Sequence, residues 1–68
     1  MRDVAIRGDM IRLGQLLKLA GVVDSGGELK ALLADTDVLV NGEPEDRRGR
    51  QLHRGDVVRV AGEELRVC

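Results

Sequence analysis

The chain has 68 residues, of which 43% are hydrophobic and none is aromatic; this is enough for one small domain over residues 1–68 and too little for a second. A core of that size, built from Val, Leu, Ile and Ala, leaves little room for a substrate cleft, so we expect no enzyme. The formal net charge of −1 excludes a uniformly basic surface, although a charge patch within one segment stays possible.

The first third of the chain predicts a short strand followed by a helix. Residues 4–6 form an apolar run of the kind found in edge strands. A helix is predicted over residues 11–20 because one face repeats every three or four positions, with Leu13, Leu16, Leu17 and Ala20. Gly21 stands where a helix ends in the left-handed conformation. Gly14 costs this helix about 1 kcal/mol relative to Ala, so we expect another part of the chain to lie close to it.

A capping signal predicts the second helix. Residues 25–28 have the form of a capping box, in which the Ser25 hydroxyl accepts a hydrogen bond from one free helix amide and Glu28 reaches back to another. The helix ends near Asp35, and its apolar stripe consists of Leu29, Leu32 and Leu33. Because the connection between the two helices is short, we expect them to pack against each other at an angle.

After the helices the apolar period changes to two, which predicts strands. Residues 38–40 lead directly into Asn41-Gly42, a strong hairpin signal because both turn positions favour positive φ. Pro44 confines the returning strand to a sheet edge. A turn at residues 54–56 and strands at residues 57–60 and 65–67 follow. The expected fold class is α+β, with two short packed helices followed by a small antiparallel sheet.

Basic charge is concentrated after the hairpin. Residues 47–54 contain no acid and four arginines, namely Arg47, Arg48, Arg50 and Arg54. This segment is either a patch that binds a polyanion or a solvated loop. The nearby carboxylates are interpreted as turn and solubility residues: Asp24, Glu43, Glu45 and Asp46.

Catalysis and metal binding are not predicted. His53 is the only histidine and has no acid or serine at a useful spacing, and it forms no metal-ligand cluster with the single cysteine, Cys68. We therefore expect no cofactor and no metal. The first ten residues contain no secretory segment, and the apolar runs are far shorter than the roughly 20 residues of a membrane-spanning helix. We expect a cytoplasmic protein with no membrane partner.

Several motifs occur together in one order and spacing. They are Arg12-Leu13, Lys18, Gly21, Ser25, Leu32-Leu33, Val38-Leu39-Val40-Asn41-Gly42 and Arg54-Gly55-Asp56-Val57-Val58. This set resembles the S-four domain, an RNA-binding domain named after small-subunit ribosomal protein four. Residues 13–21 and 24–28 are similar to a bacterial subgroup of stand-alone S-four proteins about as short as this chain. The resemblance covers roughly residues 11–60.

The resemblance implies a monomeric protein that binds structured RNA, either ribosomal or transfer RNA, without catalysis. In the family the two helices and the following hairpin form an L-shaped motif with a basic face. The helix cations would contact phosphates, Ser25 would cap a helix whose amides seat a phosphate, and Asn41 would set the hairpin. The residues assigned to RNA binding are Arg12, Lys18, Ser25, Lys30, Asn41, Arg47, Arg48, Arg50 and Arg54.

One departure from the family pattern shifts the expected interface. The family usually has Arg directly after the capping Ser, and here that position is Gly26. The arginines at 47, 48 and 50 therefore carry more of the expected phosphate contact. Because the chain has no aromatic residue, it lacks the stacking platform of single-strand binders, and the expected target is folded RNA contacted through its backbone. The alternative is a protein-interaction module whose Arg-rich loop docks an acidic partner.

Overall fold

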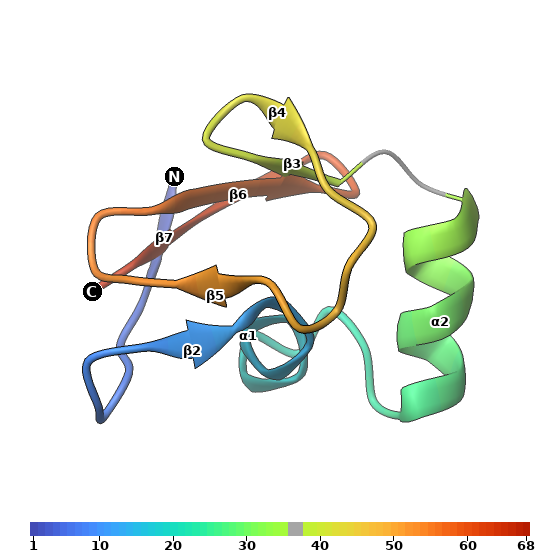
Figure 1. The fold of residues 1–68 in the computed structure, drawn as a ribbon, viewed down its shortest axis with the longest axis horizontal. Coiled ribbons are helices and arrows are strands. Elements are labelled where there is room, and N and C mark those ends of the chain that lie inside the picture. Colours follow the sequence, from blue (N-terminus) through green and yellow to red (C-terminus); the bar gives the residue numbers. More distant parts are fainter. Residues whose placement is uncertain (36–37) are drawn as a thin grey trace.

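A mixed five-stranded sheet lies at the centre of the fold in the computed structural model, which describes residues 1–35 and 38–68 (Figure 1). The strand order is β1 (Arg2–Val4), β7 (Glu63–Val67), β6 (Val57–Val60), β3 (Leu39–Val40) and β4 (Glu43–Pro44). Strand β1 runs parallel to β7, and the other neighbours are antiparallel. A second, two-stranded sheet pairs β2 (Ile11–Arg12) with β5 (Gln51–Leu52). The helices are α1 (Leu13–Leu19) and α2 (Gly26–Asp35).

The predicted hairpin between β3 and β4 is confirmed. Asn41 and Gly42 have φ values of 52° and 85°, the two positive angles that such a tight turn needs. Pro44 lies on β4, which is an edge strand as expected, so its missing amide leaves no ladder bond unmade. The hairpin register fixes which side chains of β4 and the residues after it face the core.

The α+β class is confirmed, but the order of helices followed by sheet is not. One strand was expected before the helices, at residues 4–6, and the structure has two, β1 and β2. Residues 11 and 12 were expected in the first helix, yet they pair with β5, and α1 begins only at Leu13. The sheet is mixed rather than antiparallel because β1 aligns with the last strand, with Arg2 opposite Leu65. The first and last strands of the chain are therefore neighbours in the sheet (Figure 1).

The core lies between the sheet and α1. The side chains of Leu13, Leu16 and Leu17 are fully buried there, and α2 contributes Leu29. A Cβ atom added at Gly14 would lie 2.8 Å from Leu29 Cδ2, so the expected close approach at Gly14 is confirmed. Figure 1 shows α1 end-on and α2 upright, which means that the helices lie across each other. The absence of a side chain at Gly14 lets them meet.

The start of α2 follows the predicted cap in part. The Glu28 amide donates to Ser25 Oγ at 3.2 Å, whereas the Glu28 carboxylate accepts a bond from the Asp24 amide at 3.4 Å rather than from Ser25. Both bonds satisfy amides at the start of the helix.

Neither described helix is long and apolar enough to cross a membrane.

Candidate functional site

The arginine loop, defined here as residues 45–50, is docked on the first turn of α1. The Leu13 amide donates to Arg50 O at 2.8 Å, and the Gly14 amide donates to Arg48 O at 2.9 Å. The loop carbonyls thus satisfy helix amides that have no partner within the helix. Arg12 Nη1 also donates to Gly49 O at 3.2 Å. The loop backbone is therefore held against the helix while its arginine side chains stay on the surface.

Glu45 is a buried carboxylate at the base of this loop, and its side chain is only 5% exposed. Its Oε2 accepts hydrogen bonds from the Arg47 amide at 3.1 Å and from Arg47 Nε at 3.0 Å, and its Oε1 accepts from Arg47 Nη2 at 3.0 Å and from Arg50 Nη1 at 2.9 Å. The side-chain bonds from Arg47 and then Arg50, with the Arg47 amide, lower the pKa of Glu45 from 4.5 to about 2. Glu45 is consequently ionised at neutral pH and ties two of the three loop arginines together.

Arg48 projects from the other side of the loop, towards α2. Its Nη2 would lie 3.9 Å from a Cβ atom at Gly26, so it reaches the first turn of that helix. A shallow groove between α2 and the loop is lined by Lys30, Leu33, Ala34, Asp46 and Arg48. Within residues 1–35 and 38–68, neither Lys30 nor Arg48 forms an ion pair. Both cations are thus left for a ligand.

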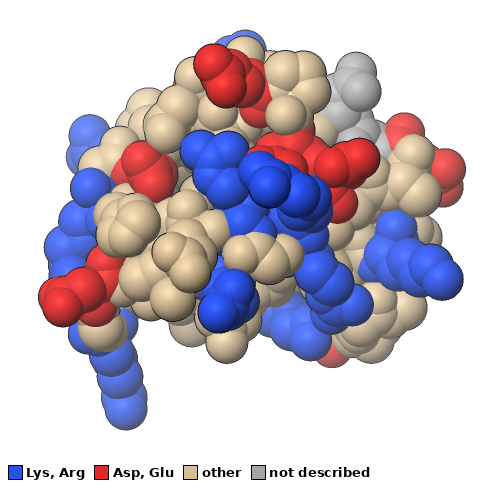
Figure 2. Space-filling model, in the orientation of Figure 1, with Lys and Arg blue, Asp and Glu red and all other residues tan. Residues whose placement is uncertain are grey.

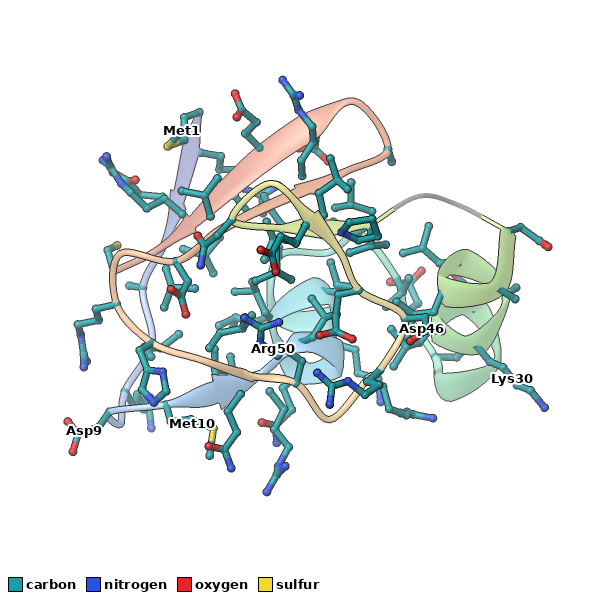
Figure 3. The ribbon with its side chains drawn as sticks, turned by 45° about the horizontal axis from the view of Figure 1, so that its top comes forward. Met1, Asp9, Met10, Lys30, Asp46 and Arg50 are labelled. Atoms are coloured by element: carbon teal, nitrogen blue, oxygen red, sulfur yellow. The ribbon has the colours of Figure 1, made fainter. Side chains whose placement is uncertain are left out.

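The cations around the loop form one surface, which we call the basic face: Arg12, Lys30, Arg47, Arg48 and Arg50. Figure 2 shows Lys and Arg side chains gathered over the segment that joins β4 to β5 and continuing towards α2. In Figure 3, Arg50 lies over the centre of this side of the molecule and Lys30 extends outward from α2. The sequence is close to neutral as a whole, but five of its eleven Lys and Arg residues belong to this face.

Comparison with known proteins agrees with the motif set. A family model described as "S4 domain" matches residues 4–68. The chain belongs to the S4 domain family. It is also 54% identical, over 59 residues, to the "Probable ribosome maturation protein RlbA" of Bacillus subtilis (strain 168), an alignment that covers 87% of this chain and 83% of the relative. The resemblance to the S-four domain is therefore confirmed.

The remaining residues assigned to RNA binding in this S4 domain lie outside the basic face or have internal partners. Lys18 is exposed in the last turn of α1, at the end opposite the loop. Asn41 Nδ2 donates to Asp56 Oδ1 at 3.0 Å, and Asn41 Oδ1 accepts from the Val57 amide at 2.9 Å. Arg54 donates to Ile6 O at 3.1 Å. Ser25 is engaged as the cap of α2. RNA contact stays a prediction for these four residues, as it does for the five of the basic face.

Asp56, in the turn between β5 and β6, has a structural role. Burial raises the pKa of Asp56, but the bonds from the His53 amide and the Asn41 side chain outweigh it and lower that pKa overall. The turn at residues 53–56 is thereby held in place, with His53 N donating to Asp56 Oδ2 at 2.7 Å.

In the part of the chain that the structure describes, no group of three His, Cys, Asp or Glu residues could hold a metal ion.

Glu45 is the residue that sequence reasoning missed, since it was interpreted as a turn and solubility residue. A signal for it was present in the hairpin. With a two-residue turn at Asn41-Gly42, Val40 pairs with Glu43 and Leu39 with Pro44, which brings Glu45 opposite Val38. The Glu45 amide indeed donates to Val38 O at 2.8 Å. Directly opposed residues share a sheet face, so the register places Glu45 on the same face as Val38. Register alone does not settle burial, because Glu43 lies opposite the buried Val40 and is exposed.

Proposed function

We propose that this S4 domain binds structured RNA, with ribosomal or transfer RNA as its targets, and that it does so without catalysis. The observation that carries the proposal is the basic face, where cations from β2, α2 and the arginine loop meet although the chain has a net charge of −1. The ribosome maturation protein that is similar to this chain supports a role connected with the ribosome.

The chemistry of the basic face suits the phosphate backbone. Arginine offers a planar set of donors that matches phosphate oxygens, and lysine adds a point charge. The chain has no aromatic side chain on which a base could stack, so sequence reading of single strands by stacking is not available to it. A folded or duplex RNA, which presents phosphates at fixed spacings, fits such a face better than an extended strand.

In this proposal residues 1–68 act as one monomeric domain in the cytoplasm, and residues 11–60 form the working motif. Helices α1 and α2 and the β3–β4 hairpin act as the L-shaped RNA-binding motif that the family resemblance implies. Arg48 brings a guanidinium to the start of α2, close to Gly26, where the family usually has an arginine. This placement supports a phosphate contact at that position from a different part of the chain.

The test is a titration of an RNA hairpin and of a polyuridine strand of equal length across a salt series. We expect tighter binding to the hairpin, and log affinity that falls linearly with log salt at about 0.9 per phosphate contact. Arg48→Glu should weaken hairpin binding strongly, whereas Arg59→Glu, a matched reversal at an exposed site on β6, should not. Tighter binding to polyuridine with a flat salt response would overturn the proposal.

The same assay addresses the docking alternative. If neither RNA binds and an acidic peptide binds with a steep salt dependence, the arginine loop serves a protein partner instead.

A further inference from the structure

Glu45 places a negative charge in the middle of the basic face. On a surface that binds a polyanion, such a charge is expected to weaken binding unless it has another effect. The carboxylate is almost completely buried, and every oxygen accepts bonds from arginine. Arg47 approaches it with Nε and Nη2, the fork geometry that fixes the plane of a guanidinium. Arg50 approaches the same carboxylate with Nη1. One acid therefore orients two cations.

Both guanidiniums keep donors for a ligand. A guanidinium has five N–H donors, and only two of those on Arg47 and one on Arg50 are used by Glu45. The Arg47 side chain is 73% exposed and that of Arg50 is 33% exposed, so the outer edges of both groups meet solvent. A phosphate oxygen can bind there while Glu45 holds the inner edges.

We propose that Glu45 is a positioning residue for RNA binding, which raises affinity by holding Arg47 and Arg50 in the orientation that phosphates need. The inference rests on the proposed function and goes beyond it, because it assigns a favourable role to an acid. A long arginine side chain that is free in solution loses rotamer freedom when it binds, and this loss weakens affinity. A guanidinium already fixed by Glu45 has lost that freedom before RNA arrives.

Two physical effects predict opposite results when the acid is removed. If charge alone decides, Glu45→Gln makes the face more positive and tightens binding. If the orientation of Arg47 and Arg50 determines affinity, the same change frees both side chains and weakens binding although the face becomes more positive. The sign of the change in affinity therefore separates the two effects.

The experiment compares Glu45→Gln with Asp46→Asn, measured with the RNA hairpin at fixed salt. Asp46 is an exposed neighbour in the same loop, so both variants lose one negative charge and only the first loses the arginine fork. We expect about tenfold weaker binding for Glu45→Gln, on the basis of two side chains that must now be ordered, and equal or tighter binding for Asp46→Asn. Glu45→Gln binding as tightly as the wild type, or more tightly, would overturn the inference while the wild type still binds RNA. A wild type that binds no hairpin overturns the proposed function itself.

A double-mutant cycle distinguishes the positioning role of Glu45 from a general role in holding the loop structure. In a chain that already carries Arg47→Ala and Arg50→Ala, adding Glu45→Gln should leave hairpin affinity equal or make it tighter, because no arginine remains to be positioned and only the charge change is left. A further loss of affinity in that background would contradict positioning and indicate a collapsed loop.

A second variant keeps the test valid if Glu45→Gln fails to fold. Arg47→Lys preserves the charge but replaces the planar guanidinium by a single ammonium group. Because the Arg47 side chain is largely exposed, we expect this variant to fold like the wild type. We expect severalfold weaker hairpin binding for Arg47→Lys and no change for Arg59→Lys, the same substitution on β6. Equal affinity of both variants and the wild type would overturn the inference.

Discussion

Replacing Gly14 by Ala tests how tightly the arginine loop, α1 and α2 are packed together. The added Cβ atom would lie 2.8 Å from Leu29 Cδ2 and 3.4 Å from Arg48 O. Leu29 is 1% exposed and belongs to the core, so its Cδ2 atom can move only by repacking among buried neighbours, and the Arg48 carbonyl belongs to the backbone that the Gly14 amide binds. We therefore expect the methyl group to displace the Leu29 side chain, the loop or α2.

The magnitude follows from two opposing contributions. Ala is favoured over Gly in a helix by up to about 1 kcal/mol, which would stabilise the variant if the site were open. Overpacking of a filled site costs about 1–3 kcal/mol. We expect the second effect to win and the free energy of unfolding to fall by about 1 kcal/mol, or about 4–8 °C in thermal midpoint for a domain of this size. Hairpin RNA affinity should fall as well, since the loop is displaced.

Gly27→Ala is the matched control. Gly14 and Gly27 are each the second residue of their helix, but a Cβ at Gly27 meets only Ser25 Oγ, at an ordinary 3.9 Å. Thermal unfolding followed by circular dichroism should show the control to be as stable as the wild type or more stable. If Gly14→Ala is stabilised to the same extent as Gly27→Ala, the packing argument is refuted.

Three further predictions concern the cap, the buried acid and the lysines. Ser25→Ala should lower the free energy of unfolding by about 0.5–2 kcal/mol through loss of the α2 cap, and an unchanged urea midpoint would show that the cap contributes nothing. The pKa of Glu45 is lowered from 4.5 to about 2 on folding, so its stabilising effect is complete above pH 4.5 and is lost as pH falls towards 2. The thermal midpoint of the wild type should therefore fall more steeply over that range than the midpoint of Glu45→Gln, and parallel profiles would contradict this. Lys30→Ala should lower the salt slope of hairpin binding by about one unit, and Lys18→Ala should do the same only if RNA extends to the far end of α1.

The parts of the fold that depend on neighbouring residues could be predicted from the sequence. Asn41-Gly42 sets its own turn because both residues tolerate positive φ, and the cap at Ser25 needs only the next three residues. The glycine at position 14 also indicated a close contact correctly, although its partners, Leu29 and Arg48, could not be named.

Pairings between distant segments were not predictable from periodicity. Strand β1 aligns with β7 across nearly the whole chain, and nothing in the local pattern of residues 2–4 specifies that partner. The first helix is expected from Ile11, yet Ile11 and Arg12 pair with β5, and this tertiary contact, which the local pattern does not specify, makes α1 begin at Leu13. The expected arginine patch is present as a surface, but the carboxylate that organises it is visible only when the hairpin register is followed to Glu45.

The most direct test of RNA binding by the basic face is the amide NMR spectrum of the protein, recorded while the RNA hairpin is added. We expect the largest shift changes at residues 45–50 and at Arg12 and Lys30, with little change on β1 and β6. The opposite pattern, with changes centred on Arg2 and Arg59 and none in the arginine loop, would contradict the proposed interface.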